Sequence, residues 1–232
     1  MNNLRLRQGY ILAIIIIGLL IGYGILRYPH IISEAGISTL LTPAFMLLVY
    51  GVVTVWITHQ PTEASSYALK SGTWFGLAIG VIFIVTISME NFVDLSQQIV
   101  TISTFCFMLA IFLVFAYAGW HSTKKSNRLS LGILASVWSA MIGVIIAILF
   151  GIIINLLFTQ RLEQNLQASA EYLRSGSHDL ETFTFWNTLD SASSHLLEVP
   201  IIAIVLGILG SLMNLGASQL QSKFAVINNR RK

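Results

Sequence analysis

The sequence predicts an all-α fold: a polytopic integral membrane bundle of six transmembrane helices, with a short helical extracytoplasmic cap between spans five and six. Three observations carry this prediction. Of the 232 residues, 55% are hydrophobic and only 10% are charged, whereas about 25% of an ordinary soluble domain is charged. Six apolar runs approach the ~20 residues that a bilayer-spanning helix needs. A single long polar interval, residues 160–198, carries six of the ten acidic residues.

The apolar runs are joined by short polar links, so we predict one membrane domain over residues 1–232. The predicted spans lie at about 9–26, 38–57, 72–88, 99–120, 129–158 and 200–215. The first run follows Arg5 and Arg7, as in a signal peptide, but it is long enough to span and lacks a small-residue cleavage pattern. We therefore expect it to remain as the first span. Pro43 lies near the start of the second run, where a helix tolerates proline best.

The fifth apolar run is longer than a membrane requires. Its 30 residues, 129–158, would form a helix of about 45 Å at ~1.5 Å per residue. The hydrocarbon core of a bilayer is only about 30 Å thick. The helix must therefore tilt, or extend beyond the lipid into the polar interval.

The first half of the polar interval has the pattern of an amphipathic helix. Leu162, Leu166 and Leu173 recur at helical spacing, which predicts one apolar face. Gly176 follows at a point where a helix would end in the left-handed conformation. We expect this segment either to continue the fifth span or to bend and lie along the membrane interface.

The second half of the interval predicts an aromatic anchor followed by a separate short helix. Residues 183–186, Phe-Thr-Phe-Trp, suit the membrane interface. Asn187 can cap a helix in which Asp190 complements the N-terminal dipole. This helix is expected to end near Glu198, because Pro200 follows and begins span six.

The basic residues sort to one side of the predicted membrane. With six spans and the N-terminus inside, ten of the thirteen lysines and arginines lie in cytoplasmic segments, which leaves Arg27, Arg161 and Arg174 outside. Since lysine and arginine favour cytoplasmic loops, we predict a protein of the cytoplasmic (plasma) membrane with both termini cytoplasmic. Residues 160–198 are then extracytoplasmic.

Small residues recur every four positions in four of the predicted spans. The sets are Gly18 and Gly22; Gly72, Gly76 and Gly80; Gly143, Ala147 and Gly151; and Ala203, Gly207 and Ser211. This spacing places small side chains on one helix face and permits close helix packing. It does not distinguish packing within one chain from a homodimer or a contact with another membrane protein. Spans two and four lack such a stripe and are expected at the lipid-facing periphery.

Ionisable residues are missing from the interior of the predicted spans. Ion-coupled transporters and proton relays usually carry such residues, so this pattern weighs against a secondary transporter. Polar side chains do lie within the spans, Asn155 and Asn214 among them. They predict interhelical hydrogen bonds, with contact to a substrate as the alternative.

The candidate binding residues combine these two asparagines with histidines and acids of the polar interval. They are Asn155, His178, Asp179, Glu181, Asp190, His195, Glu198 and Asn214. Imidazoles beside carboxylates suit zinc binding or acid–base catalysis, but no metal-site or protease motif accompanies them. Helix caps and surface ion pairs are the plainer interpretation, so we predict no catalytic residue, no metal ligand and no cofactor.

Two further features bear on partners. Cys106 is the single cysteine, so no intrachain disulfide can form. The net charge of +3 is not gathered into the kind of basic stripe that binds nucleic acid. The expected partners are the lipid bilayer and, through the small-residue faces, a second copy or other membrane proteins.

Three functions are compatible with these patterns. The first hypothesis is a non-catalytic accessory, assembly or regulatory component that acts through helix packing and an extracytoplasmic docking surface. The second is a small-solute transporter or channel lined by Ser, Thr and Asn. The third is a metal-dependent membrane enzyme that uses His178, His195 and the surrounding acids. A polar cavity under residues 160–198, with Asn155, His195 and Asn214 in its walls, would favour the second, and a flat surface the first.

Overall fold

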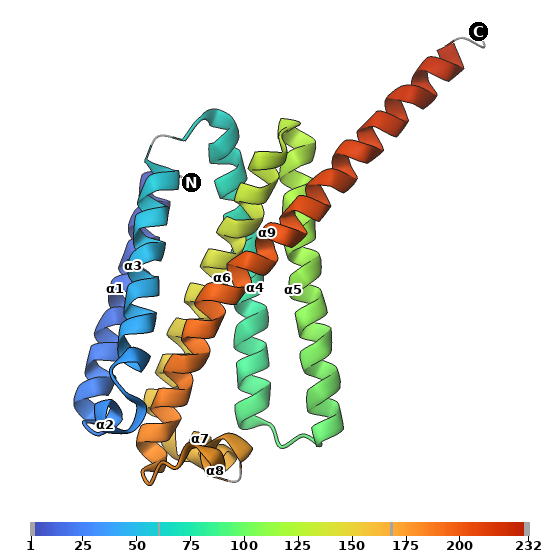
Figure 1. Cartoon of the computed structure of the whole chain (residues 1–232). Helices are drawn as coiled ribbons and strands as arrows, with labels where there is room; N and C mark the ends of the chain where they lie inside the picture. The colour runs from blue at the N-terminus through green and yellow to red at the C-terminus, as the bar shows by residue number, and fades with distance from the viewer. Residues whose placement is uncertain (1–2, 60, 168, 230–232) are drawn as a thin grey trace.

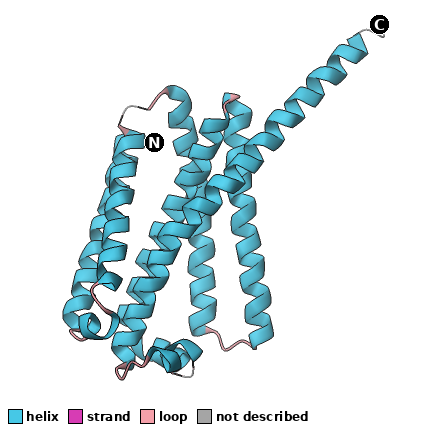
Figure 2. Cartoon of the chain, viewed as in Figure 1, coloured by secondary structure: helices cyan, strands magenta, loops and turns pink. Residues whose placement is uncertain are grey.

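The computed structural model describes residues 3–59, 61–167 and 169–229, and these residues form an all-α bundle with no strand among them (Figure 2). The helices are α1 (Asn3–Arg27), α2 (Ile31–Ala35), α3 (Ser38–Thr58), α4 (Glu63–Phe92), α5 (Gln97–Ser126), α6 (Leu129–Leu157), α7 (Thr159–Leu166), α8 (Ala170–Ser175) and α9 (Leu180–Asn229). Six of them, α1, α3, α4, α5, α6 and α9, are long and apolar enough to cross a membrane. The predicted fold class is confirmed.

The two ends of the bundle differ in what they carry (Figure 1). Both chain termini lie at one end, which we call the terminal end. The short helices α2, α7 and α8 lie at the other, together with the link between α4 and α5, and we call this the cap end. The C-terminal part of α9 projects away from the other helices at the terminal end.

Helix α6 is the centre of the bundle. In its most apolar window 67% of the residues are buried inside the protein, against 11–28% for the other five long helices. Its Trp138 is fully buried and donates its indole N–H to the Thr73 hydroxyl of α4 at 3.0 Å. Tyr10 of α1 donates its hydroxyl to the Met141 carbonyl at 3.2 Å. Because lipid offers no hydrophobic drive between helices, such close packing and hydrogen bonding hold the bundle together.

The glycine stripe of α4 packs against α6. A Cβ added at Gly76 would lie 2.7 Å from the Ile142 Cβ and 2.8 Å from the Ser139 carbonyl oxygen. One added at Gly143 of α6 would lie 2.5 Å from Ile79 on α4. These contacts lie within one chain, so the two stripes bring two helix backbones of the same bundle together.

The stripe of α9 packs within the chain as well. Ser136 of α6 donates its hydroxyl to the Ala203 carbonyl at 2.8 Å. A Cβ added at Gly119 of α5 would lie 2.5 Å from the Gly207 carbonyl oxygen. The lone Gly119 lets one face of α5 approach α9 without a four-residue repeat, and α5 is still the least buried of the six long helices, as expected for span four.

The largest departure from the sequence prediction is α9. It runs from Leu180 through Pro200 without a break, so the predicted cap helix and span six are one helix, and residues 180–198 belong to it. Proline lacks the N–H that would bond to the carbonyl four residues earlier. Here the buried Tyr50 hydroxyl of α3 donates to that carbonyl, on Leu196, at 2.7 Å. The lost backbone bond is thereby replaced.

The cap consists of α7 and α8, which follow a sharp end of α6. Phe158 has φ −124° and ψ 34°, which ends α6 and turns the chain into α7. The segment after span five is predicted either to continue that helix or to bend, and the chain bends. Gly176 ends α8 in the left-handed conformation, with φ 71°, as expected. The predicted aromatic anchor is wrong for Phe183 and Phe185, which are buried because this segment is the first part of α9, and Phe185 packs on Tyr28. Trp186 is half-buried.

Candidate functional site

A partly open cavity of about 520 Å³ lies in the cap-end half of the bundle, between five helices. It takes residues from α4, α5, α6, α7 and α9. Its polar lining residues are Thr86, Glu90, Asn91, Thr104, Asn165, Thr184, Asn187, Thr188, Ser191 and His195. The volume is within the ~300–1,000 Å³ range of small-molecule sites, and apolar walls with a few convergent polar groups are typical of such sites.

Helical periodicity places these residues in the cavity. On α9 the lining residues Thr184, Thr188, Ser191 and His195 recur every three or four positions, which keeps them on one helix face. On α4 the lining residues also recur every three or four positions, up to the last turn before the helix ends at Phe92. Two polar helix faces therefore meet across the cavity.

The cavity changes character with depth. Glu90 and Asn91 lie in the last turn of α4 at the cap end, whereas Phe83 lies seven residues earlier, which is about 10 Å along the helix. The Phe83 and His195 rings meet edge to face with centroids 5.9 Å apart. The inner part is completed by apolar side chains such as Ile111. The cavity is therefore polar toward the cap end and mainly apolar deeper in the bundle.

The His195 imidazole is oriented by its own helix. Its Nδ1 lies 2.7 Å from the Ser191 carbonyl oxygen, a distance that fits donation by Nδ1–H. With the ring held this way, Nε2 is left as the acceptor on the neutral imidazole.

Among the described residues that line the cavity, Glu90 is the only one with an acidic side chain. It accepts a hydrogen bond from the Thr104 hydroxyl of α5 at 3.0 Å. Over the described ranges, the one ion pair joins Arg161 to Asp94 and does not include Glu90. The lining residues that the structure describes include neither lysine nor arginine.

Asn155 supports the α9 wall of the cavity. It is 1% exposed, and its Nδ2 donates to the Thr184 carbonyl at 3.0 Å and to the Thr188 hydroxyl at 2.8 Å. Both threonines line the cavity. Its Oδ1 is buried without a partner. One turn earlier on α6, Gly151 lines the cavity, and a Cβ added there would meet no atom within 4 Å.

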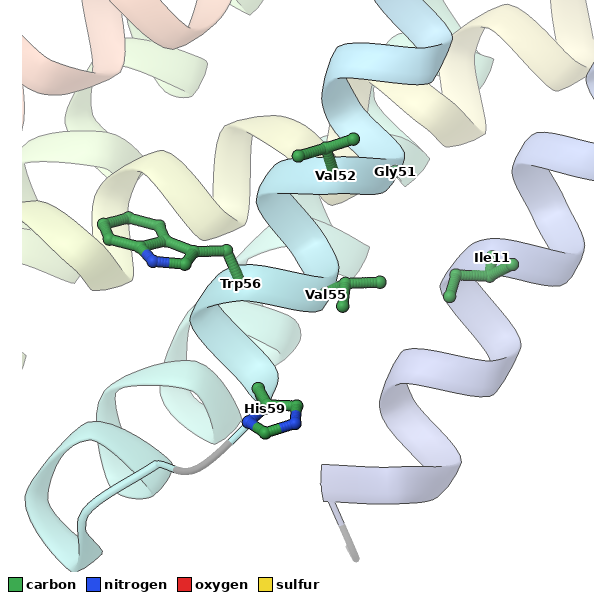
Figure 3. Close-up of a pocket in the computed structure, with 6 residues that line it drawn as sticks. All are labelled: Ile11, Gly51, Val52, Val55, Trp56 and His59. Atoms are coloured by element: carbon green, nitrogen blue, oxygen red, sulfur yellow. The ribbon is translucent and has the colours of Figure 1, made fainter.

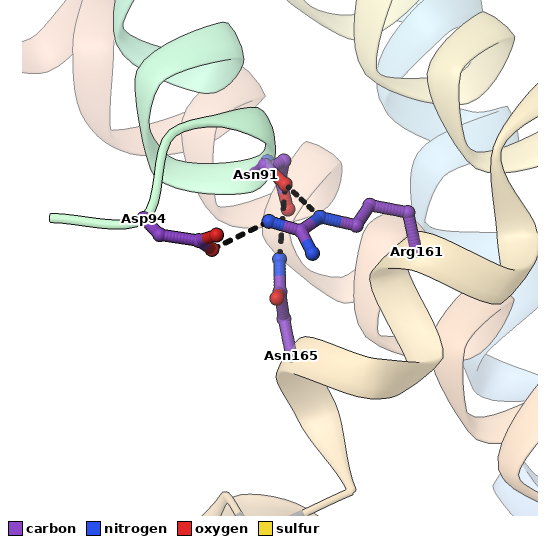
Figure 4. A network of polar contacts seen from close by, with 4 residues as sticks. All are labelled: Asn91, Asp94, Arg161 and Asn165. Carbon is purple, nitrogen blue, oxygen red and sulfur yellow. Dashed lines mark hydrogen bonds and ion pairs between the residues drawn. The ribbon is translucent and has the colours of Figure 1, made fainter.

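Helix α7 is fastened across the cap end of the cavity (Figure 4). Arg161 bonds to the Asp94 carboxylate at 2.6 Å, and its Nε donates to the Asn91 carbonyl at 3.2 Å. Asn165 donates its side-chain amide to the same carbonyl, also at 3.2 Å. The final carbonyls of a helix lack partners within it, so α7 supplies donors to the end of α4. Leu162, on the same short helix, also lines the cavity.

Asp179 is the N-cap of α9. Its carboxylate accepts from the Thr182 backbone N–H at 3.2 Å and from the Thr182 hydroxyl at 2.6 Å. Desolvation pushes the pKa of Asp179 upward, but the hydrogen bonds from Thr182 and the nearby His30 outweigh it, and the net pKa is lowered. The predicted cap, Asn187, instead lies inside α9 and lines the cavity.

The predicted histidines lie far apart. His178 is exposed in the link before α9, while His195 is 15 residues past the first residue of that helix, or about 22 Å along it. Over the described part of the chain, no three His, Cys, Asp or Glu side chains are grouped so that they would hold a metal ion.

The remaining predicted residues lie outside the cavity lining. Glu181, Asp190 and Glu198 are exposed on α9. Asn214 is buried, but it lies 19 residues beyond His195 on α9, about 28 Å toward the terminal end. Of the eight candidates, His195 lines the cavity and Asn155 lies behind its α9 wall.

A second hollow lies between α1 and α3 near the terminal end, and Figure 3 shows its residues. It is larger, about 780 Å³, and lined by Ile11, Gly51, Val52, Val55, Trp56 and His59. It is an apolar surface groove: Trp56 is 80% exposed and Val52 60% exposed. Such a surface suits contact with lipid, so the cavity with convergent polar groups is the stronger candidate site.

Sequence reasoning missed most of the cavity lining. The signal was present in α4, where Thr86, Glu90 and Asn91 share a face, and in the matching face of α9. The sequence prediction divides the α9 residues between an aromatic anchor, a short helix and a later span, so it does not place them on one helix face. Comparison of the chain with protein-family models, with curated proteins and with solved structures found no match.

Proposed function

We propose that this protein binds a small solute in the cavity between α4, α5, α6, α7 and α9 and carries it across the membrane. The supporting observation is the cavity itself: about 520 Å³, with a polar end, an apolar end and a fastened helix across its mouth. This corresponds to the second of the three functions compatible with the sequence. Ser, Thr and Asn side chains line it. Of the three residues named for its walls, His195 lines it, while Asn155 lies behind the α9 wall and Asn214 lies outside the lining.

The packing around the cavity supports entry from the cap end. Toward the terminal end, Gly76 brings α4 against α6 so closely that a Cβ would not fit. The contact of Gly119 with Gly207 brings α5 against α9 in the same way. By the distribution of basic residues the cap end is predicted to be extracytoplasmic, so we propose that solute enters from outside when α7 releases the end of α4. Transport then requires these glycine contacts to open while α7 stays fastened across the cap end.

The test is solute flux into proteoliposomes, with Gly151→Leu as the cavity-filling variant. Its side chain enters open space in the cavity, so the variant is expected to fold and to lose flux. Gly216→Leu is the matched control, because a Cβ there also meets no atom within 4 Å but Gly216 is outside the lining. Flux that Gly151→Leu leaves unchanged, or no flux from a broad panel of amines, amino acids, sugars and organic acids, would overturn the transport proposal.

A docking role is the second candidate, and the face of α1 favours it. Whereas the stripes of α4 and α9 are occupied within the chain, a Cβ added at Gly18 or Gly22 would meet no atom within 4 Å. A small-residue face open to lipid permits close approach of another transmembrane helix. Gly18→Ile is expected to reduce any oligomer or complex seen after extraction in mild detergent. An unchanged size distribution for this variant would count against docking through α1.

A further inference from the structure

We infer that the cavity selects an organic cation: a primary amine or related ammonium group on an apolar body about 10 Å long. This inference rests on the proposed function, and it names the chemical class of the solute. It follows from the charge of the lining, from the position of that charge and from the apolar wall at the opposite end.

The charge of the lining comes from one residue. Over the described part of the lining, Glu90 is the only carboxylate, and no lysine or arginine is present to balance its charge. Arg161 of α7 is bound to Asp94 and to the Asn91 carbonyl and is not part of the lining. An anionic solute would meet a carboxylate without a counter-charge, whereas an ammonium group would supply that charge.

The groups around Glu90 suit an ammonium donor. An ammonium group has three N–H donors and no acceptor. The Glu90 carboxylate uses the Thr104 hydroxyl as a donor at 3.0 Å, and a carboxylate has further lone pairs for a second and third donor. Hydrogen bonds between ionised partners are roughly twice as strong as neutral ones. The polar end of the cavity therefore favours an ammonium over a hydroxyl group.

The apolar end fixes the shape of the rest of the solute. Phe83 lies about 10 Å deeper than Glu90 along α4, and its ring meets that of His195. Ile111 and Ile148 complete this end of the lining. A ring or branched hydrocarbon fits here, and its burial is favourable by the area that it removes from water. A four-carbon chain spans the distance between such a ring and the carboxylate.

The inference is tested with three probes that differ in one group: 4-phenylbutylamine, 4-phenylbutan-1-ol and 4-phenylbutyrate. Binding to the full-length protein is measured by calorimetry in nanodiscs of zwitterionic phosphatidylcholine, so that the lipid itself does not attract the amine. The amine is expected to bind about tenfold more tightly than the alcohol, as expected for one charge-assisted contact. The carboxylate is expected to bind more weakly than the alcohol.

Glu90→Gln is the decisive variant, because it keeps the shape and an acceptor for Thr104 but removes the charge. In this variant the affinity for the amine should fall to that for the alcohol, while the alcohol binds as in the wild type. Glu198→Gln is the matched control, since Glu198 is exposed on α9 and outside the lining. It should leave all three affinities unchanged.

The outcomes separate this inference from the proposed function. If probe binding survives Gly151→Leu, the probes do not bind in the cavity and the assignment of an organic cation is overturned. If none of the probes binds the wild type, that assignment fails as well, whereas the proposed function fails only if no solute of the broad panel shows flux that Gly151→Leu abolishes. If the probes bind in the cavity but the amine has no advantage, or keeps its advantage in Glu90→Gln, the cavity stands as a solute site. The assignment of an organic cation is then overturned.

Discussion

Single side chains at the ends of helices determine where this bundle changes direction. Asp179 begins α9 by accepting two hydrogen bonds from Thr182. Arg27, at the end of α1, donates to the Leu156 carbonyl at 2.8 Å and so supplies a donor to the end of α6. Arg161 does the same for α4. Each of these contacts satisfies a terminal backbone group that its own helix leaves unpaired.

Asp179→Ala is expected to destabilise the protein by about 1 kcal/mol, the usual cost of an N-cap. The loss should be measured as a lower midpoint of thermal unfolding in detergent. Because the folded-state pKa of Asp179 is lowered, its stabilisation is present above the usual aspartate range and is lost as the pH falls through the lowered pKa. Asp190→Ala is the control: Asp190 is exposed, so its removal should change stability by less than about 0.5 kcal/mol. Equal effects of the two variants would contradict the assigned cap.

Glu163 on α7 gives the opposite dependence on pH. Desolvation raises its pKa, as do the charges of Glu181 and Asp179, and one of its carboxylate oxygens is buried without a partner. The ionised form therefore costs stability above the raised pKa, and this cost disappears as the pH falls through it. Glu163→Gln should raise the thermal midpoint at pH 8 and make little difference at pH 4. A midpoint that falls at pH 8 would show that the charge is stabilising.

At the scale of the helices, contacts between elements compensate for a backbone hydrogen bond or a small-residue repeat that the local sequence lacks. Pro200 would normally interrupt a helix, yet α9 continues because the Tyr50 hydroxyl of α3 donates a hydrogen bond to the Leu196 carbonyl. Similarly, α5 lacks a repeated stripe, yet Gly119 meets the backbone of α9 at Gly207. The cavity depends on this continuity, since the α9 face that lines it extends from Thr184 to His195.

The pairing of Tyr50 with the Leu196 carbonyl is tested by a double-mutant cycle. Tyr50→Phe leaves a buried carbonyl without its donor and should cost about 1–3 kcal/mol of unfolding free energy. Pro200→Ala restores a backbone N–H that can bond to this carbonyl, so the cost of Tyr50→Phe should fall below about 0.5 kcal/mol in that background. Chemical denaturation of the four proteins measures the coupling. Additive effects would show that the tyrosine does not compensate for the proline.

At the scale of the whole molecule, the two ends have different compositions and packing. The terminal end is held by close glycine contacts between α4 and α6 and between α5 and α9. The cap-end half contains the cavity, and α7 spans it through Arg161 and Asn165. This asymmetry fits a bundle that binds a solute from one side. Which side of the membrane the cap end faces therefore decides the direction of entry.

The predicted orientation is testable by cysteine labelling in a Cys106→Ser background. His178→Cys places an exposed thiol at the cap end, and Glu63→Cys places one at the terminal end. A membrane-impermeant maleimide added to intact cells should label residue 178, and residue 63 should react only after lysis. Both positions are exposed, so they form a matched pair. The reverse pattern would invert the predicted topology.

Local patterns were sufficient for those parts of the structure that the membrane dictates. Length and apolarity identified six spans, because every backbone group in lipid must be bonded within a helix. The amphipathic pattern around Leu162 and Leu166 anticipated α7, and Gly176 anticipated the end of α8. These features depend on residues close together in the chain, whose spacing and backbone preferences can be read directly.

The continuous course of α9 and the candidate site were decided only by the tertiary structure. Local signals at Pro200 favoured an interruption, because nothing near it in the chain reveals that Tyr50 would supply the missing donor from 146 positions away in sequence. Once α9 is continuous, Thr184, Asn187 and His195 lie on a face opposite Glu90 and Asn91. The sequence by itself determined a six-span helical membrane protein. Contacts between distant segments determined the cavity, because helices pack through side chains that the chain order does not bring together.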